Sequence, residues 1–311
     1  MPAGSPLSRL SGYPRWVLIV GTAVVLSLAG AFGLVRATNS QLDGVARVPD
    51  VTPALSPATP GIENYLLVGS DSREGSDPTD PDYANVGGVD TQPGQRSDTL
   101  MVLRYDTNNE SVSLMSVPRD LWARIGSGEK FDKINAAYRH GPDTVVRTVQ
   151  RALNIPIHHY LEVNFQGFKT IVDAIHGVEI CVDRASRDKH TGFYIGRRAC
   201  KTVNGTQALA FARSRHFEQK YKEGGWKLDP TADIGRTARQ RQFVTSLLKS
   251  AAKYVAEHPL DAAAVMRRST SAFSVDDGLK LIDLARKLRP AASGGAVSYA
   301  LPVSLDMING M

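Results

Sequence analysis

The sequence predicts an α/β fold with α+β character: a mixed central β-sheet flanked by helices, preceded by one N-terminal transmembrane helix. Three observations support this. Short apolar runs of strand length alternate with longer amphipathic segments, two of the runs are joined by a polar turn, and an uncharged apolar run lies near the N-terminus. The 311 residues are 42% hydrophobic and 22% charged, which is ordinary for a globular protein with a substantial core.

The N-terminal apolar run, residues 16–35, is long enough to cross a bilayer as a helix. A cleavable signal peptide is the alternative, because "AGA" at 29–31 resembles a cleavage site. The run exceeds the usual signal-peptide core, and Arg9 and Arg15 precede it, so we expect an anchor with its N-terminus inside. Residues 1–15 then form a short cytoplasmic tail, and the rest of the chain lies outside the cell membrane.

The part after the anchor divides by composition. Residues 36–60 carry four prolines and little periodicity, so we expect a stiff linker. Residues 61–311 then form one extracytoplasmic domain. Within it, the Asp-, Gly- and Pro-rich stretch 71–95 is expected to be a solvated loop.

The periodicity of the exported part predicts six strands and six helices. The expected strands are 65–69, 99–105, 111–117, 160–165, 177–182 and 296–301. The expected helices are 142–153, 165–175, 204–213, 234–256, 260–268 and 275–288.

The two cysteines, Cys181 and Cys200, both fall in the exported part, where an oxidising environment permits a disulfide between them. Two buried free thiols are the alternative. Neither cysteine has metal-ligand spacing and no histidine pair forms H-E-x-x-H, so zinc is not expected.

Two charged motifs meet at the open end of the predicted hairpin. If its turn centres on Asn108, Asp98 faces Pro118 and Arg96 faces Asp120. A structural salt-bridge cluster is one interpretation of these charges. An anion site that holds a metal with carboxylates is the other.

The helix expected at 234–256 places Arg236 and Gln240 in line with its apolar stripe, so both should point into a cleft. An arginine facing a phosphate there adds to the anion site of the helix N-terminus. Asp233 is expected to cap the helix, and Arg239 and Arg241 are expected on its solvated flanks.

Arg213 and Arg215 are two residues apart, so they share a side only if the preceding helix ends near 213. Taken together, scattered arginines and carboxylates suggest a diphosphate site with a divalent cation. The arginines concerned are Arg96, Arg119, Arg213, Arg215 and Arg236. The net charge of +6 fits an anionic partner.

Seven motifs in this order resemble the LytR-CpsA-Psr family of cell-wall glycopolymer ligases, over roughly Tyr65 to Ser250. They are "VGSDSR", "RSDTLMVLRYD", "SVPRDLW", "KINAAYRHG", "NFQGFKTIVDAIHGVEICVD", "NGTQALAFARSRH" and "DIGRTARQRQF". The resemblance implies a membrane-anchored phosphotransferase that moves a phosphoglycan from a polyprenyl diphosphate carrier to a peptidoglycan hydroxyl. It also implies Mg²⁺ or Mn²⁺ and an apolar lipid groove between sheet and helices.

The resemblance assigns roles by motif position. Asp71 and Asp98 would ligate the metal, and either one is a candidate base for the acceptor hydroxyl. Asp71, Asp98, Arg119 and Arg236 would form the catalytic group. The diphosphate would be held by Arg73, Arg96, Arg119, Arg213, Arg215, Arg236 and Gln240. Lys133 and Asn135 would shape the site.

Two departures from the family pattern stand out. His176 replaces a glycine in the "GGV" turn, which we interpret as a structural adaptation. Residues 216–232 widen the spacing between the arginine pair and "DIGR", as an acceptor-side loop or a solvated insertion. The cysteine pair and composition resemble actinobacterial members, for which arabinogalactan would be the polymer.

Two other functions use the same features. A diphosphatase that hydrolyses the same lipid carrier needs identical residues. A wall-binding or anion-binding membrane-anchored regulator needs no catalysis and would tolerate loss of Asp98. Nucleic-acid binding is not expected, because the domain is exported and no helix-turn-helix or basic helix is recognisable.

Overall fold

A computed structural model of the chain describes residues 45–71, 97–258, 261–289 and 296–302. The predicted anchor at 16–35, Arg73, Arg96 and the loop 72–95 lie outside these residues, as do the side chains of Asp98 and Asp233. No helix within the described ranges combines the length and apolar character that a membrane span requires.

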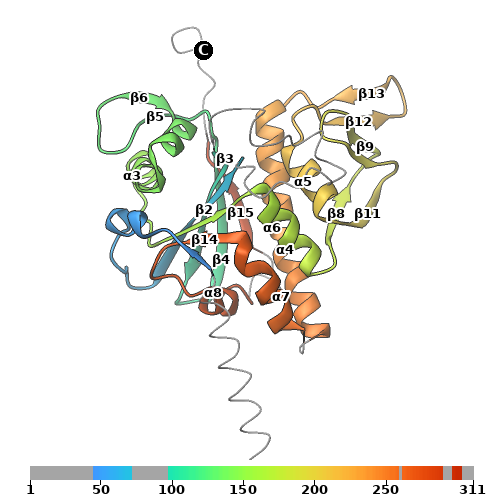
Figure 1. The fold of residues 1–311 in the computed structure, drawn as a ribbon. Helices are drawn as coiled ribbons and strands as arrows, with labels where there is room; N and C mark the ends of the chain where they lie inside the picture. Colours follow the sequence, from blue (N-terminus) through green and yellow to red (C-terminus); the bar gives the residue numbers. More distant parts are fainter. Residues whose placement is uncertain (1–44, 72–96, 259–260, 290–295, 303–311) are drawn as a thin grey trace, which may run out of the picture. The chain divides into compact units, whose positions relative to one another are not determined.

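The centre of the domain is a seven-stranded mixed sheet in the order β1-β14-β7-β2-β3-β4-β15, which confirms the predicted architecture (Figure 1). Strand β2 pairs antiparallel with β3 and parallel with β7, and β3 pairs antiparallel with β4. The strands are β1 (Ala46–Arg47), β2 (Ile62–Ser70), β3 (Ser97–Asp106), β4 (Ser111–Val117), β7 (His159–Val163), β14 (Phe273–Val275) and β15 (Val297–Ala300).

Helices cover both faces of the sheet. Successive residues of a strand point to opposite faces, and in the central strands both sets are largely apolar. Leu66 and Val68 of β2 pack with η2, η4 and α3, whereas Tyr65 lies in a second cluster with residues of α6 and α8. The helices are η2 (Pro49–Ala54), η4 (Ile134–His140), α3 (Pro142–Leu153), α4 (Phe165–Ala174), α5 (Gly205–Arg213), α6 (Ala232–Glu257), α7 (Ala262–Ser269), η5 (Thr270–Ala272) and α8 (Leu281–Lys287).

The described residues also form three smaller ladders around this core, and of their strands only β8 was predicted, as 177–182. A four-stranded sheet has the order β10-β9-β12-β13, and two-stranded ladders pair β11 with β8 and β5 with β6. Residues 216–232 therefore contain a hairpin that extends a sheet, not an irregular insertion. The strands are β5 (Trp122–Arg124), β6 (Phe131–Lys133), β8 (Val178–Val182), β9 (Ser186–Asp188), β10 (Phe193–Ile195), β11 (Ala199–Val203), β12 (Glu218–Tyr221) and β13 (Gly225–Leu228).

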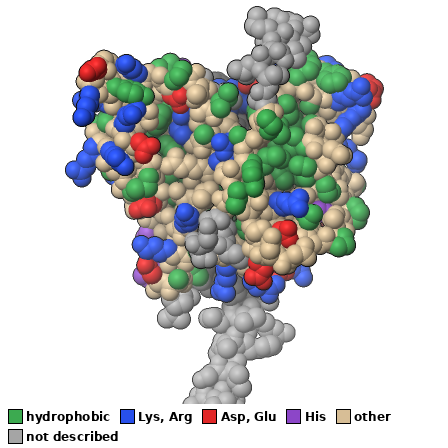
Figure 2. Space-filling view, turned by 180° about the vertical axis from the view of Figure 1, so that it is seen from behind, with side chains coloured by type: hydrophobic (Ala, Val, Ile, Leu, Met, Phe, Trp, Pro, Cys, Tyr) green, Lys and Arg blue, Asp and Glu red, His purple; other side chains and the backbone are tan. Residues whose placement is uncertain are grey.

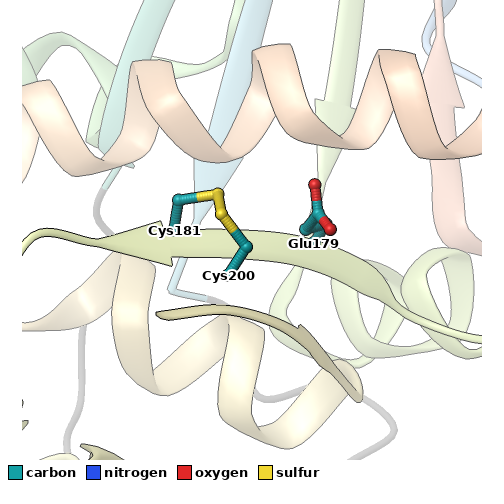
Figure 3. Close-up of side chains that lie close together, drawn as sticks. All are labelled: Glu179, Cys181 and Cys200. Atoms are coloured by element: carbon teal, nitrogen blue, oxygen red, sulfur yellow. A yellow bond between two sulfur atoms is a disulfide. The ribbon is translucent and has the colours of Figure 1, made fainter. Parts of the chain in front are cut away.

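The predicted disulfide is present. Cys181 of β8 and Cys200 of β11 are directly paired across the ladder and are bonded, with Glu179 two residues away on the same strand (Figure 3). Because both sulfurs are in the bond, this group of side chains is not a thiolate metal site. The α6 side chain Gln242 donates to the Cys181 carbonyl at 2.8 Å, so the ladder also contacts α6.

Two local expectations are resolved by backbone geometry. His176 has φ 59°, in the left-handed region, which explains why a glycine suits this turn and supports a structural role for the histidine. The last helix begins at Leu281 and not at 275, because Phe273–Val275 form β14. The buried Asp276 then accepts the backbone amide of Gly278 and turns the chain.

The expected linker is wrong for residues 45–60, which belong to the domain. Strand β1 pairs with β14, and Val51 and Ala54 of η2 are buried in the core cluster that contains α3. Arg47 also donates to the carbonyl oxygens of Asp276 and Leu279, at 2.8 and 2.9 Å. Proline content suggested a linker, but the prolines here initiate and punctuate a short packed helix.

This placement makes a stability prediction. Val51→Ala removes two buried carbons and leaves a cavity, so we expect the free energy of unfolding to fall by about 2 kcal/mol. Thr52→Ala, at the exposed neighbouring position, should change it by less than about 0.5 kcal/mol. Urea denaturation measures both, and equal small effects would restore the linker interpretation.

Candidate active site

The charged motifs of the sequence converge on one edge of the central sheet. Strands β2, β4 and β7 run in the same direction and β3 runs against them, so three strand ends and one strand start share this edge. Asp71 follows β2, Asp98 lies at the start of β3, and Arg119 follows β4. The carboxyl ends of strands are where α/β sheets commonly bind ligands.

The two aspartates come from neighbouring strands. Ser70 of β2 pairs with Ser97 of β3, while Gly69 pairs with Thr99, so Asp98 is the extra residue of a β-bulge. Bulges are frequent beside active sites. Asp71 is the next residue after Ser70, and the backbones of both aspartates therefore lie at one place on the edge.

Two tyrosines share a carboxylate near the end of β2, and one of them is within electrostatic reach of Asp71. Tyr138 of η4 and Tyr160 of β7 both donate to Glu162, the latter at 2.6 Å. Burial raises the pKa of the Tyr138 hydroxyl, and the carboxylates of Glu162 and Asp71 raise it further. Tyr138 therefore stays protonated and acts as a donor between two acidic groups.

The "PRD" segment after β4 is held by the "KIN" segment. The amide of Asn135 donates to the Arg119 carbonyl at 3.1 Å, and the amide of Ile134 donates to the Leu121 carbonyl at 2.8 Å. Asp120 forms ion pairs with both Arg119 and Lys133, each at 3.4 Å. Lys133 and Asn135 thus fix the position of the segment that carries Arg119.

The predicted hairpin register is wrong by one residue. Leu100 pairs with Val117 and Asp106 pairs with Ser111, so the numbers of paired residues sum to 217 and not 216. The connection spans four residues, and its last one, Glu110, has φ 54°. The expected pairing of Asp98 with Pro118 therefore does not hold, and that of Arg96 with Asp120 lies outside the described residues.

The first turns of α6 present a polar face that is buried. Arg236, Arg239 and Gln240 are 2%, 6% and 8% exposed, followed by the buried Phe243. Arg236 and Gln240 thus lie on the buried side of α6, where Gln240 donates to the Ala212 carbonyl at 3.4 Å, and a cleft on this side stays a prediction. Asp233 does not cap the helix, because the helix begins at Ala232 and Thr231 occupies the N-cap.

The expected surface position of Arg239 is wrong. Its guanidinium donates to Asp229 at 3.0 Å and to the Ser214 carbonyl at 2.7 Å, and it stacks on Phe217. Residues three apart on a helix are neighbours, so Arg239 shares the face of Arg236.

Arg241 also departs from the expected surface position. It is half-buried and donates to the buried Ser116 of β4 at 3.0 Å, and burial lowers its pKa. Neither Arg239 nor Arg241 therefore serves as a solvent-exposed control for Arg236.

Helix α5 ends at Arg213, as the spacing of the arginine pair predicted. Arg213 is half-buried with its guanidinium 4.6 Å from the centre of the Phe165 ring, and Arg215 is exposed. Ser214, between them, is fully buried. Arg213 and Arg215 thus lie at the end of α5, on either side of a residue that is held in place by burial.

Ser214 is held by a buried carboxylate, which the sequence analysis did not identify. Asp188 of β9 accepts from the Ser214 hydroxyl at 2.6 Å and from the His216 amide at 2.9 Å. Burial raises the pKa of Asp188, but these bonds and those from the His190 and Thr191 amides outweigh it, so its pKa is lowered. Asp188 and Arg239 together hold the segment that carries Arg213 and Arg215.

We predict that Asp188→Asn destabilises the fold by about 3 kcal/mol at pH 7, because several hydrogen bonds to a charged acceptor are weakened. The folded-state pKa is depressed, so the contribution is complete above the unfolded pKa, about 3.9, and is lost as pH falls through the folded value. The difference in unfolding free energy between wild type and Asp188→Asn, taken from unfolding curves, should therefore be complete at pH 7 and should shrink as the pH is lowered below the unfolded pKa. Asp183→Asn, at an exposed position, is the control, and a pH-independent difference would contradict this role of Asp188.

The chain can now be compared with known proteins. The sequence model of the LytR_cpsA_psr family matches residues 36–311. The chain belongs to the LytR-CpsA-Psr family. It is 32% identical over 304 residues to the probable cell wall biosynthesis protein LcpB of Corynebacterium glutamicum, covering 97% of this chain and 68% of that protein.

A second relative carries a more specific name. The polyisoprenyl-teichoic acid–peptidoglycan teichoic acid transferase TagU of Bacillus anthracis is 41% identical over 160 residues. This match covers 51% of the chain and 48% of TagU, so it spans about half of each protein.

Solved structures of this family share the fold. The LytR-Csp2A-Psr enzyme from Actinomyces oris superposes with a TM-score of 0.67 at 24% identity, covering 84% of this chain and 88% of that one. TagT bound to LI-WTA gives a TM-score of 0.57 at 20% identity, covering 82% and 85%. The family resemblance of the motifs and the predicted mixed sheet are thereby confirmed.

Proposed function

We propose that the protein is a cell-wall glycopolymer transferase that moves a phosphoglycan from a polyprenyl diphosphate carrier to a hydroxyl of peptidoglycan. One observation carries the proposal: within a chain of the LytR-CpsA-Psr family, the segments that carry Asp71, Asp98 and Arg119 meet at one edge of the sheet. The names of LcpB and TagU, relatives in cell-wall biosynthesis and teichoic acid transfer, support the reaction class.

In the proposed reaction, the acceptor hydroxyl attacks the phosphorus that bears the glycan. The new phosphorus–oxygen bond forms as the diphosphate anhydride bond breaks, polyprenyl monophosphate leaves, and a carboxylate accepts the hydroxyl proton. Such a transfer depends on positive charge around the phosphoryl oxygens. Arg119, Arg213, Arg215 and Arg236, with Arg73 and Arg96 from outside the described residues, would supply it, and Gln240 would add a neutral donor.

The donor set at the edge fits Mg²⁺, or Mn²⁺ in its place. The backbones of Asp71 and Asp98 lie on adjacent strands, and Mg²⁺ is usually held by one or two carboxylates and substrate phosphates. A bound divalent ion would neutralise charge on the diphosphate.

The lipid part of the donor needs an apolar surface near this edge. Val244, Leu247 and Leu248 of α6 stay half-buried although they pack against the core clusters. Apolar side chains also gather in one area of the face turned away in Figure 1 (Figure 2). We further propose residues 16–35 as a single-pass anchor, the domain as extracytoplasmic, and arabinogalactan as the polymer of an actinobacterial member.

The experiment follows a label. The chain in detergent is mixed with Mg²⁺, a polyprenyl diphosphate-linked glycan labelled in its sugar, and a peptidoglycan oligosaccharide. Label joined to the oligosaccharide through a phosphodiester supports the transferase, and Asp98→Ala should abolish it. Label released only as free phosphoglycan would make the protein a diphosphatase. The absence of any turnover would favour a binding protein.

A further inference from the structure

We propose that the outer face of the four-stranded sheet β10-β9-β12-β13 binds the acceptor, a carboxylate-bearing peptidoglycan strand. The inference rests on the proposed function and deepens it, because it places the second substrate. In Figure 1 this sheet lies at the upper right, outside α5.

The first argument is charge. Residues 183–229 hold eleven lysines and arginines against five aspartates and glutamates, a net charge of +6. The whole chain also has a net charge of +6, so its entire positive excess lies in this segment. Lysine and arginine side chains are spread over the corresponding upper left side of Figure 2. A segment this basic favours an anionic partner beside it, and stem peptides of peptidoglycan carry carboxylates.

The second argument is the composition of the outer face. Phe193 and Ile195 of β10 are buried in the core, so the alternate residue, Tyr194, points outward and is 58% exposed. The pairing register then places Tyr194, Arg187, Glu218 and Leu228 in one row across the four strands. Lys220 and Trp226 form the next row.

The third argument is the arrangement of its aromatic rings. The Arg187 guanidinium lies 4.1 Å from the centre of the Trp226 ring and also pairs with Glu218. The Arg184 guanidinium, 4.3 Å from the Tyr221 ring, lies at the end of the same hairpin on the opposite face, because Tyr221 directly follows Lys220. The stack on Trp226 leaves the edge of the Arg187 guanidinium, where Glu218 already accepts from Nε, as the place at which a ligand carboxylate would bind. Exposed rings beside it suit the apolar faces of sugar rings.

The sheet is continuous with the proposed catalytic edge. Asp188 of β9 binds the Ser214 hydroxyl and the His216 amide, and Arg215 lies between these two residues. Asp229, directly after β13, binds Arg239 of α6. A strand lying on the sheet would therefore lead into the arginines that hold the diphosphate. The glycan of the donor is the competing occupant, but a neutral polymer such as arabinogalactan would not require the positive charge.

The test measures acceptor binding without the donor. The full chain in detergent is titrated with soluble, un-cross-linked peptidoglycan strands, and with chitin oligosaccharides, which share the sugar backbone but lack stem peptides. We expect binding of the peptidoglycan strands to weaken with salt and binding of chitin to be weaker. Tyr194→Ala/Lys220→Ala should reduce strand affinity roughly tenfold or more. Tyr299→Ala/Lys253→Ala, at exposed positions on β15 and α6, should not.

Steady-state kinetics separate this inference from the function on which it rests. We expect the Tyr194/Lys220 variant to raise KM for the acceptor with kcat and polyprenyl diphosphate binding unchanged. If the variant still transfers label and its affinity for the acceptor is unchanged, the outer face of the sheet is not the acceptor site, and the proposed transferase function is unaffected. If the variant loses affinity only for the glycan of the donor, the outer face binds the donor, and the proposed acceptor site is also refuted. If the wild-type protein binds peptidoglycan strands through this sheet but transfers no label, the acceptor site is supported and the transferase function is refuted.

Discussion

Arg236→Ala is expected to lower kcat/KM for transfer roughly a hundredfold, the effect of losing one or two charged hydrogen bonds to the diphosphate. The side chain is buried in the first turns of α6, at the end of the helix whose dipole favours anions. Arg236→Lys keeps the charge but loses the forked geometry, so it should recover only part of the activity. The measurement is the initial rate of label transfer over a range of donor concentrations.

The control for this variant must come from the same helix. Lys253→Ala is suitable, because the Lys253 side chain is 74% exposed and its ion pair with Glu257 is at the surface. It should leave kcat/KM within about twofold. Thermal unfolding must show that Arg236→Ala is folded. Activity of a folded Arg236→Ala protein equal to that of Lys253→Ala would remove α6 from the diphosphate site.

Asp71→Asn is expected to reduce transfer about a thousandfold, because a neutral amide of the same size no longer attracts a divalent cation that would stabilise the phosphoryl charge by several kcal/mol. Binding of Mn²⁺, followed by electron paramagnetic resonance, should weaken in parallel. The readout is independent of turnover, so a defect in the metal site can be told apart from a defect in the acceptor.

The matched control lies at the other edge of the sheet. Asp277 is exposed and follows β14, which runs against β7, so it is remote from Asp71. Asp277→Asn should keep both Mn²⁺ affinity and activity. Normal Mn²⁺ binding by Asp71→Asn would exclude that carboxylate from the metal site.

The long periodic elements were predictable from sequence, since their apolar patterns are set by the sheet they pack against. Strand β4 and helix α3 have the predicted bounds, and α4 and α5 differ by one residue. The short strands β9, β10, β12 and β13 were not found. They are three or four residues long, which is too short for a clear alternation of apolar and polar residues. They are strands because they pair with one another in the folded protein.

The sequence motifs that form the site were predictable, but the positions and contacts of several of their side chains were not. The meeting of Asp71, Asp98 and Arg119 follows from the directions of β2, β3 and β4. The position of Arg239 was misjudged because its flank of α6 is covered by Ser214 and Asp229, which approach from other elements. Asp188 gave no signal in sequence, because its role depends on a tertiary contact with the end of α5. The hairpin register depended on the backbone of a single turn residue, Glu110.

A structure of the chain with Mg²⁺ and a short polyprenyl diphosphate tests the central claim most directly. The account predicts a diphosphate at the carboxyl end of β2 and β4, with the metal on Asp71 and an oxygen within hydrogen-bond distance of Arg236. The chain has another basic recess, lined by Gly126, Arg147 and Arg151 on the α3 side. A diphosphate bound there, with the Asp71 edge vacant, would contradict the account.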